Sequence, residues 1–223
     1  MKARLIILDD NVPSRGLLNE WGWSVLVEGR HRFIFDADTN PLVLAHNSRA
    51  LGVSLRNLDF GFLSHWHHDH YGGFQYIAEL NPGLRLYVPP GNLAMAMRWG
   101  FEPVVVGKGA LREGDGLWVS GPVDDFEQAL GIETSSGLVV IVGCSHPGVD
   151  RLTEAVLEAS GYEKAHAVVG GFHYPKLRAL DRLAEMSELI APAHCSGDDA
   201  KRYVVRRYPE KFVEVRTGSV LEF

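Results

Sequence analysis

The sequence predicts an α/β protein with mixed β-sheets and helices on the outside. Short apolar segments rich in Val, Ile, Leu and Phe alternate with helix-like segments along the whole chain. Two early strand-like segments, 23–28 and 32–36, are separated only by Gly29-Arg30-His31, which indicates a hairpin. Later strand-like segments alternate with helix-like ones, as in sheets that contain parallel strands.

The predicted strands are apolar and are bounded by Gly, Pro, Asn or Asp. They are 3–9, 23–28, 32–36, 58–63, 84–88, 102–106, 116–120, 127–134, 138–143, 165–170, 188–191 and 212–216. The predicted helices are 41–51, 73–80, 91–98, 149–160, 176–187 and 198–206. In 149–160, apolar residues from Val149 to Leu157 recur three and four positions apart, which predicts one buried face. Asp150 or Ser145 is the expected N-cap of that helix.

Length and composition indicate one globular domain, residues 1–223. Hydrophobic residues make up 46% and charged residues 22%, which excludes disorder, collagen and coiled coil. A chain of this length buries enough apolar surface to fold without metals or disulfides. The net charge of −6 argues against nucleic-acid binding through overall charge. The Gly-rich segment 106–109 lacks the spacing of a phosphate-binding loop and is predicted to be a turn.

The sequence predicts a cytoplasmic protein with no membrane partner. The apolar run Leu5 to Leu8 is too short for a signal peptide. The later run Leu138 to Val142 is too short to cross a bilayer. Two cysteines, Cys144 and Cys195, are too few for a disulfide scaffold, which favours a reducing compartment. As ordinary structural residues, both would be small buried side chains.

Seven of the ten histidines fall in loops that follow predicted strands. Four different strands run out into such a loop, and ligand sites of open α/β sheets lie beyond the carboxyl ends of strands. We therefore expect these loops to converge on a site. The seven residues are His65, His67, His68, His70, His146, His173 and His194.

The first of these loops carries the strongest signal for metal binding. In an extended segment residues i and i+2 point the same way, so His65 and His67 present two imidazoles to one metal. The chain then turns, which brings Asp69 and His70 toward a second ion. A pair of glycines follows and permits a tight turn and a close backbone approach. Imidazole and carboxylate ligands together suit Zn, Mn or Fe.

The other histidines are assigned individually. His68 is expected to point away from the first two ligands. His146 and His194 are candidate ligands, whereas His173 is either a ligand or a contact to substrate. No chemical role is assigned to His31, His46 and His166.

The motif His65-x-His67-x-Asp69-His70, preceded by a strand and Ser64 and followed by two glycines, resembles the metallo-β-lactamase superfamily. Most of the chain resembles one subgroup, which is related to 7,8-dihydropterin-6-ylmethyl-4-(β-D-ribofuranosyl)aminobenzene 5′-phosphate synthase. The matching segments are Asp10-Asn11, Glu20-Trp21-Gly22-Trp23-Ser24, Phe35-Asp36, His46-Asn47, Leu63 to Gly73, Gly143-Cys144-Ser145-His146-Pro147-Gly148, Gly170-Gly171-Phe172-His173 and Ala193-His194-Cys195-Ser196-Gly197.

The resemblance implies an αββα sandwich, in which two mixed sheets lie face to face with helices outside and the metals at one edge. It implies two groups of three ligands, one group for each ion. The first group is His65, His67 and His146; the second is Asp69, His70 and His194. Zn is the expected cofactor, as one or two ions, with Mn, Fe or Mg as alternatives.

The sequence departs from the family pattern between His70 and His146, where it has no histidine. The bridging Asp of relatives is also absent, so either Cys144 replaces that acid or His146 fills the site.

Several further residues are expected to support the site. Asp36 would hold the metal ligands from behind. Asn11 and Asn47 either touch substrate or stabilise loops. Lys176 and Arg178 either hold a phosphate or lie on a solvated helix face.

Three functions compete. The favoured one is a hydrolase in which metal-activated water attacks an anionic small molecule and Asp69 orients or deprotonates that water. The second is a transferase, in which a ribofuranosylaminobenzene phosphate displaces diphosphate from a dihydropterin methyl group. The third is a non-enzymatic metal-binding or redox protein, but redox relatives of this fold carry Glu where this chain has His67. The expected partner is a phosphorylated or pterin-like small molecule, with no nucleic acid; homo-oligomerisation is left open.

Overall fold

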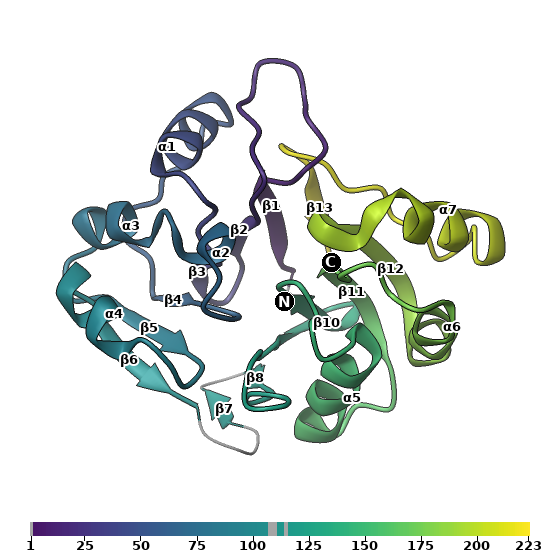
Figure 1. The fold of residues 1–223 in the computed structure, drawn as a ribbon. Coiled ribbons are helices and arrows are strands. Elements are labelled where there is room, and N and C mark those ends of the chain that lie inside the picture. The colour runs from purple at the N-terminus through teal and green to yellow at the C-terminus, as the bar shows by residue number, and fades with distance from the viewer. Residues whose placement is uncertain (1, 107–110, 114–115) are drawn as a thin grey trace. The chain divides into compact units, whose positions relative to one another are not determined.

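The computed structural model of the protein describes residues 2–106, 111–113 and 116–223. The chain divides into two compact units, each built on one β-sheet (Figure 1). The N-terminal unit comprises Lys2–Val105 and Arg216–Glu222. The C-terminal unit comprises Val106–Val215 and Phe223.

The N-terminal unit contains a seven-stranded mixed sheet. The strands from β13 to β3 pair antiparallel, and those from β3 to β6 pair parallel. In sheet order they are β13 (Val220–Glu222), β1 (Arg4–Asp9), β2 (Ser24–Glu28), β3 (Arg32–Phe35), β4 (Phe60–Phe62), β5 (Arg85–Val88) and β6 (Glu102–Val105). The predicted hairpin is confirmed, because Val25 pairs with Phe35 and Glu28 with Arg32.

Helices cover one face of this sheet. They are α1 (Pro41–Ala50), α2 (His68–Tyr71), α3 (Phe74–Leu80) and α4 (Leu93–Trp99). Leu44 of α1 and Phe74 of α3 belong to one buried cluster with Leu26 and Ile34 of the sheet. Helix α1 begins where the Asn40 side chain accepts a hydrogen bond from Leu42 N at 2.9 Å, which satisfies a backbone donor of the first turn.

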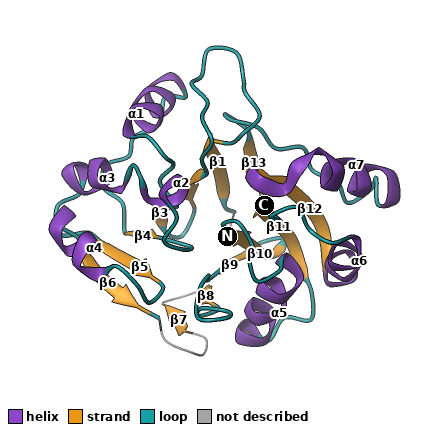
Figure 2. Cartoon of the chain, viewed as in Figure 1, coloured by secondary structure: helices purple, strands orange, loops and turns teal. Residues whose placement is uncertain are grey.

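The C-terminal unit contains a six-stranded mixed sheet, in which β10, β11 and β12 are parallel and the other pairs antiparallel. In sheet order the strands are β12 (Ser187–Ala193), β11 (Ala165–Gly171), β10 (Gly137–Val142), β9 (Leu130–Thr134), β8 (Leu117–Val119) and β7 (Leu111–Glu113). The helices of this unit are α5 (Val149–Ser160), α6 (Leu177–Met186), the 3₁₀ helix η1 (His194–Ser196) and α7 (Gly197–Arg207). Figure 2 shows the helices and strands separated by colour.

The parallel strands fix where the loops of this unit emerge. Strands β10 and β11 are each followed by a loop and then by α5 or α6, and β12 is followed directly by η1 and α7. Leu152 of α5 and Leu183 of α6 pack in one buried cluster with Val140, Val168 and Ile190 of the sheet. The carboxyl ends of these three strands therefore open on the same edge of the sheet.

The predicted α/β class with two mixed sheets and helices is confirmed. All six predicted helices are present, with ends that differ by two residues or fewer. The buried face predicted for α5 is confirmed by Val149, Leu152 and Val156, which have no exposed surface.

Other expectations are wrong. The segment 212–216 is not a strand, because it meets β12 only through one bridge between Phe212 and Ile190 and cannot continue a ladder. The short elements α2, β7 and β13 were not expected. The N-cap of α5 is Gly148, with a φ of 117°, because Ser145 donates its hydroxyl to Gly171 O at 2.7 Å and Asp150 lies inside the helix.

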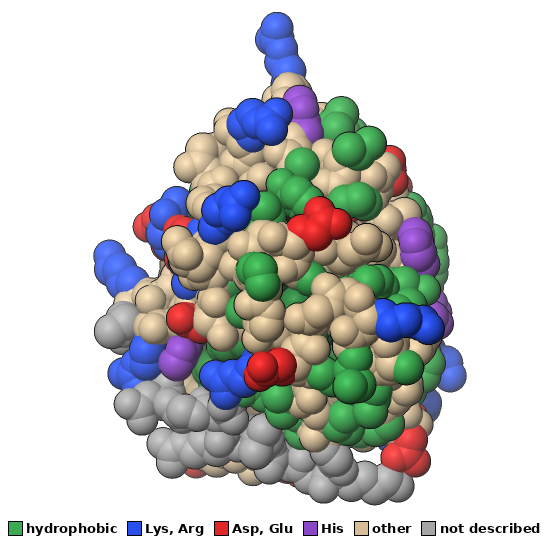
Figure 3. Space-filling view, turned by 90° about the vertical axis from the view of Figure 1, so that its left-hand side faces the viewer, with side chains coloured by type: hydrophobic (Ala, Val, Ile, Leu, Met, Phe, Trp, Pro, Cys, Tyr) green, Lys and Arg blue, Asp and Glu red, His purple; other side chains and the backbone are tan. Residues whose placement is uncertain are grey.

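The predicted turn at 106–109 lies outside the described residues, apart from Val106. The prediction that residues 1–223 form one domain stays a prediction. Among the described residues, no helix combines the length and the hydropathy that crossing a bilayer requires. On the face drawn in Figure 3, basic and acidic side chains of the described residues are interspersed with apolar ones.

Candidate metal centre

The loop after β4 gathers His65, His67, Asp69 and His70 in the N-terminal unit. The ring centroid of His65 lies 4.6 Å from that of His67 and 4.2 Å from that of His70. Nε2 of His70 is 3.7 Å from the Asp69 carboxylate. Three imidazoles and one carboxylate thus share a small volume, and ligation of a metal by them stays a prediction. His68 is exposed and lies edge-on to the Tyr71 ring.

Two glycines let this loop pack against the segment after β3. A Cβ at Gly72 would lie 2.0 Å from the backbone oxygen of Thr39, and one at Gly73 would lie 2.3 Å from that of Ala37. Gly72 has a φ of −57° and Gly73 a φ of −90°, so neither needs the left-handed region. Close backbone approach, rather than a tight turn, accounts for both glycines.

Asp36 holds two of the rings from behind. Its carboxylate is fully buried and accepts hydrogen bonds from Ser64 N at 2.8 Å and Ser64 Oγ at 2.7 Å. It also contacts Nδ1 of His70 at 2.6 Å, and Ser64 Oγ contacts Nδ1 of His65 at 2.9 Å. These contacts at Nδ1 make Nε2 the coordinating atom that each ring would offer to a metal.

Burial of His70 lowers the pKa of its imidazole to about 4. The nearby Asp69 carboxylate opposes this change, and His67 adds to it. His70 is therefore neutral at physiological pH, which is the form of histidine that binds metals.

Trp21 orients the Asp69 carboxylate. Its indole Nε1 donates to Oδ2 of Asp69 at 3.0 Å, and the backbone of Trp23 donates to the Asp69 carbonyl at 3.2 Å. Ala37 N donates to the His70 carbonyl at 2.7 Å. Two loops distant in sequence thus fix α2. In the sequence, Trp21 stood out only as part of a segment that matches the family, and its contact with Asp69 was missed.

The two asparagines lie in the same unit, Asn47 in α1 and Asn11 in a loop. Asn47 is fully buried; its side-chain amide donates to Leu8 O and Leu18 O and accepts from Leu18 N at 2.8 Å. Of its two expected roles, these contacts favour loop stabilisation. Asn11 is half-buried in the loop that follows β1.

A buried acid pair lies beside these loops. Asp9 accepts hydrogen bonds from Glu20 N at 3.1 Å and from Thr217 Oγ1 at 3.0 Å. Burial, with the charge of Asp38 as a second cause, raises the pKa of Asp9 to about 8. Burial also raises the pKa of Asp38 to about 6.

The other predicted site residues lie in the C-terminal unit. The first of them along the chain are Cys144 and His146, and Glu127 fixes the backbone of the loop that carries them. Its buried carboxylate accepts hydrogen bonds from three consecutive backbone amides, those of Cys144, Ser145 and His146, each at 2.8 Å. One side chain thereby sets the path of the loop that carries His146. Sequence reasoning missed Glu127, because its only signal was an acid at the start of a predicted apolar strand.

His146 and His173 meet between two neighbouring loops. Their ring centroids are 4.0 Å apart, and Phe126 lies edge-on to His146 at 5.2 Å. His173 and Tyr174 have φ angles of 46° and 48°, in a region that residues other than glycine rarely adopt. Such strain occurs where the surrounding structure holds a functional loop in place.

The two cysteines lie together as buried free thiols. Sγ of Cys195 is 3.2 Å from Sγ of Cys144, and a nitrogen of His173 lies within 4.8 Å of both sulfurs. His194 is buried at the start of η1, with a φ of 46°. Ser196 joins η1 to the end of β11, because its hydroxyl accepts from Phe172 N at 3.0 Å and donates to Ala193 O at 2.6 Å.

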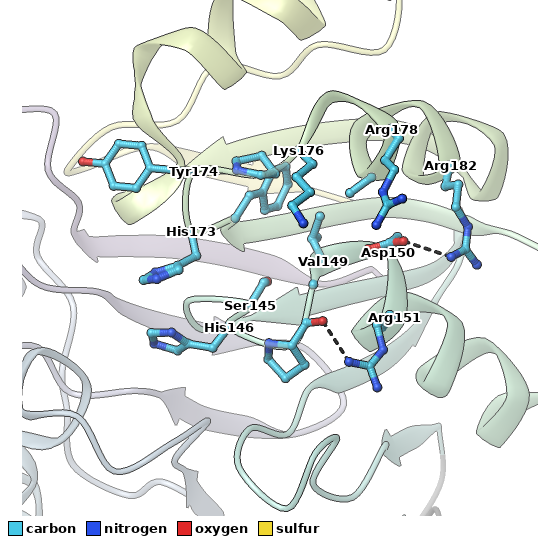
Figure 4. A pocket seen from close by; sticks show the side chains of 15 residues that line it. Ser145, His146, Val149, Asp150, Arg151, His173, Tyr174, Lys176, Arg178 and Arg182 are labelled. Carbon is cyan, nitrogen blue, oxygen red and sulfur yellow. Dashed lines mark hydrogen bonds and ion pairs between the residues drawn. The ribbon is translucent and has the colours of Figure 1, made fainter.

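A cavity of about 570 Å³ lies next to His146 and His173 (Figure 4). Its walls come from the loop between β10 and α5, the loop between β11 and α6, and the first turns of both helices. Lys176 and Arg178 line it on the α6 side.

The donor set of the first loop fits a transition metal. His65, His67 and His70 supply nitrogen and Asp69 supplies oxygen, the ligand types that Zn, Mn and Fe accept. The backing that Asp36 gives to two of the rings is the arrangement found behind metal-bound histidines.

Comparisons with known proteins agree with this chemistry. A curated relative, the 7,8-dihydropterin-6-methyl-4-(beta-D-ribofuranosyl)-aminobenzene-5′-phosphate synthase of Methanocaldococcus jannaschii, is 24% identical over 92% of this chain and 90% of its own length. A solved metal-dependent hydrolase of the β-lactamase superfamily has a TM-score of 0.85, with 26% identity over 99% of both chains. A diphosphatase of the PhnP family has a TM-score of 0.67 and 15% identity over 100% of this chain and 98% of its own, which shows the fold alone.

The family model of the metallo-beta-lactamase superfamily matches residues 23–157. This match begins at Trp23 in the N-terminal unit and ends at Leu157 in α5, and so includes the His65 to His70 loop, Glu127 and His146. Because the matched segment covers more than half of the sequence, the chain belongs to the metallo-β-lactamase superfamily.

Proposed function

We propose that this protein is a metal-dependent hydrolase that uses metal-activated water on an anionic small molecule. The observation that carries the proposal is the loop His65 to His70, in which three imidazoles and a carboxylate lie together. From a fully buried position, Asp36 contacts the His70 ring directly and the His65 ring through Ser64 Oγ. Membership of the metallo-β-lactamase superfamily supports the same chemistry.

The proposed ligands form two groups, one for each ion. They are His65, His67 and His146 for one ion, and Asp69, His70 and His194 for the other. Zinc is the proposed metal, as one or two ions, with Mn, Fe or Mg as alternatives. Cys144 and His173 remain candidates for metal or substrate contact.

A bound metal would act as a Lewis acid, which polarises the substrate and lowers the pKa of bound water to about 7. Asp69 is the proposed proton acceptor. Trp21 Nε1 donates to its Oδ2, so the indole fixes the orientation of the carboxylate. Asp36 accepts a hydrogen bond from Nδ1–H of neutral His70, which sets the tautomer of that ring. Glu127 fixes the backbone that carries His146.

The proposal is tested by measuring hydrolysis when no arylamine acceptor is present. Protein purified without chelators is assayed for metal content and for hydrolysis of simple phosphodiesters and lactones. We expect at least one transition metal per chain and activity that chelation removes and zinc restores. A folded, active, metal-free protein would refute the proposal.

A second candidate is the condensing transferase, because the curated relative is named as a synthase. In that reaction the aryl nitrogen bonds to the pterin methyl carbon, and diphosphate leaves. Diphosphate release that requires the arylamine acceptor, without hydrolysis in its absence, would favour this function. Metal binding without either activity would favour the non-enzymatic alternative.

We also propose that the two units act as one domain, residues 1–223, since the curated relative matches 92% of the chain. The cytoplasmic location and the absence of nucleic-acid partners stay predictions.

A further inference from the structure

The cavity beside His146 and His173 has the size of a small-molecule site. Its volume of about 570 Å³ falls within the range of about 300–1,000 Å³ that such sites occupy. It lies wholly within the C-terminal unit. His146 and His173 stand at one side, and the start of α6 stands at the other (Figure 4).

The lining of this cavity is basic, although the protein carries a net charge of −6. Four cationic side chains line it: Arg151, Lys176, Arg178 and Arg182. Asp150 is the one acid among the described residues that line it. A concentration of positive charge in a concave site of an acidic protein favours an anionic ligand there.

Two of these four cations are already engaged by acids. Arg151 forms two hydrogen bonds with Asp124, at 2.5 and 2.7 Å, and a third with Pro147 O at 3.1 Å. Arg182 binds Asp150 at 3.1 Å and Glu154 at 3.2 Å. These ion pairs hold the two arginines in the wall of the cavity.

Lys176 and Arg178 differ from these two arginines, because they are not held by ion pairs with described residues. Within the described part of the chain, neither side chain makes an ion pair or a hydrogen bond, and both line the cavity. Lys176 is the N-cap of α6, a ten-residue helix whose first turn has no acidic residue and no capping side chain. The amide groups of that turn add to the positive potential of the two side chains.

We propose that this cavity binds the phosphate monoester of the substrate, with Lys176 and Arg178 as its phosphate-binding side chains. Two uncompensated cations match a dianionic phosphate better than a singly charged carboxylate. The space between them and His146 then holds the organic part of the substrate, with its reacting bond toward the histidines. The inference rests on the proposed hydrolase and narrows its substrates to phosphorylated molecules.

The test measures binding to metal-free protein, which separates the phosphate site from metal chemistry. Phenyl phosphate, benzoate and phenol are titrated into chelator-treated, dialysed protein by calorimetry. We expect phenyl phosphate to bind about tenfold tighter than benzoate, and phenol to bind weakest. The double variant K176A/R178A should lose about tenfold or more in affinity for phenyl phosphate, since charge-assisted hydrogen bonds are lost.

The matched control is K201A/R206A, which removes the same two charges from α7 outside the cavity. Its affinity for phenyl phosphate should stay within about twofold of the unmodified protein, because exposed charges at a distance are screened by salt. An equal loss in both double variants, or no loss in K176A/R178A, would overturn the proposal. Circular dichroism of both variants verifies that they are folded.

Failure of this inference is distinguishable from failure of the proposed function. If the unmodified protein hydrolyses a neutral lactone but K176A/R178A binds phenyl phosphate normally, the phosphate site is wrong and the hydrolase stands. If phenyl phosphate binding depends on the pair but no ester or lactone is hydrolysed with any metal, the hydrolase is wrong.

Discussion

At the scale of single residues, the site depends on carboxylates that are not themselves expected to touch a metal. Asp36 contacts Ser64 and His70, and Glu127 gathers three backbone amides. The histidine motif made the ligands predictable, because their spacing alone indicates metal binding. Glu127 and Trp21 were not predictable as site residues, because their partners lie 17 to 19 and 48 positions away in the sequence.

Asp36→Asn should weaken zinc binding and hydrolysis. Oδ1 of Asp36 accepts from Ser64 N, whereas Oδ2 accepts from Ser64 Oγ and contacts Nδ1 of His70. An amide has only one oxygen, so its NH₂ group must face either the Ser64 N–H or the contacts that Oδ2 now makes. Loss of such a backing residue typically costs about 10–100-fold in metal affinity or activity. A competition titration against a zinc chelator measures the affinity. Asp199→Asn, on the exposed side of α7, is the control and should bind zinc normally; equal affinities for all three proteins would contradict this role of Asp36.

Glu127→Gln should destabilise the C-terminal unit. The side-chain NH₂ would face a backbone N–H where the carboxylate now accepts, which leaves a buried donor unsatisfied. We expect a loss of about 1–3 kcal/mol in the free energy of unfolding, measured by urea denaturation. Glu163→Gln, at an exposed position, serves as the control and should change stability by less than about 0.5 kcal/mol. A Glu127 variant as stable as its control would show that the three amides find other partners.

At the scale of elements, the longer helices could be predicted, but the short helix α2 and the strands β7 and β13 could not. Helix α5 carries an apolar stripe with helical spacing, and α1 has an Asn-Pro start, so local sequence was sufficient. Strand β13 has only three residues and exists because β1 offers it an edge, with Leu5 opposite Leu221. The segment 212–216 has apolar residues but only one bridging contact. Strand formation depends on a partner that the local sequence does not reveal.

The acid pair at the end of β1 predicts a pH-dependent stability. The pKa of Asp9 is about 8 in the folded protein and about 4 when unfolded, so the folded state binds one more proton between these values. This group's contribution to stability therefore falls as the pH rises from about 4 to about 8. Asp38 acts in the same direction between about 4 and about 6.

Asp9→Asn tests this linkage, because the amide does not titrate. Urea denaturation at pH 5 and pH 8 should show a smaller loss of stability for this variant than for the unmodified protein. Asp198→Asn, at an exposed position of α7, should keep the original pH dependence. The same slope in all three proteins would rule out Asp9 as the source.

At the scale of the whole molecule, the family could be predicted from the sequence, but the substrate could not. The His65 to His70 motif and the later histidine loops were sufficient to identify the superfamily, and the family model spans both units from residue 23 to residue 157. We propose that the substrate is selected by the shape and charge of a cavity built from segments around residues 146 and 176. Neither segment shows by itself that Lys176 and Arg178 line a common cavity.

Each unit has a large buried core, so the metal should serve catalysis rather than folding. His67→Ala should abolish hydrolysis and leave the circular dichroism spectrum close to that of the unmodified protein. His68→Ala, in the same loop but with an exposed side chain against Tyr71, is the control and should retain activity. Complete unfolding of the His67 variant would instead make the metal structural.

One titration can decide whether metal-dependent hydrolysis, the activity proposed for this chain, is its activity. Zinc is added back to metal-free protein, and hydrolysis of a lactone or phosphodiester is followed without any acceptor while bound zinc is measured. We expect no turnover at zero zinc and a rate that rises with the amount of bound zinc until one or two ions per chain are present. Turnover by the folded, metal-free protein, or turnover only when an arylamine acceptor is supplied, would contradict the proposed activity.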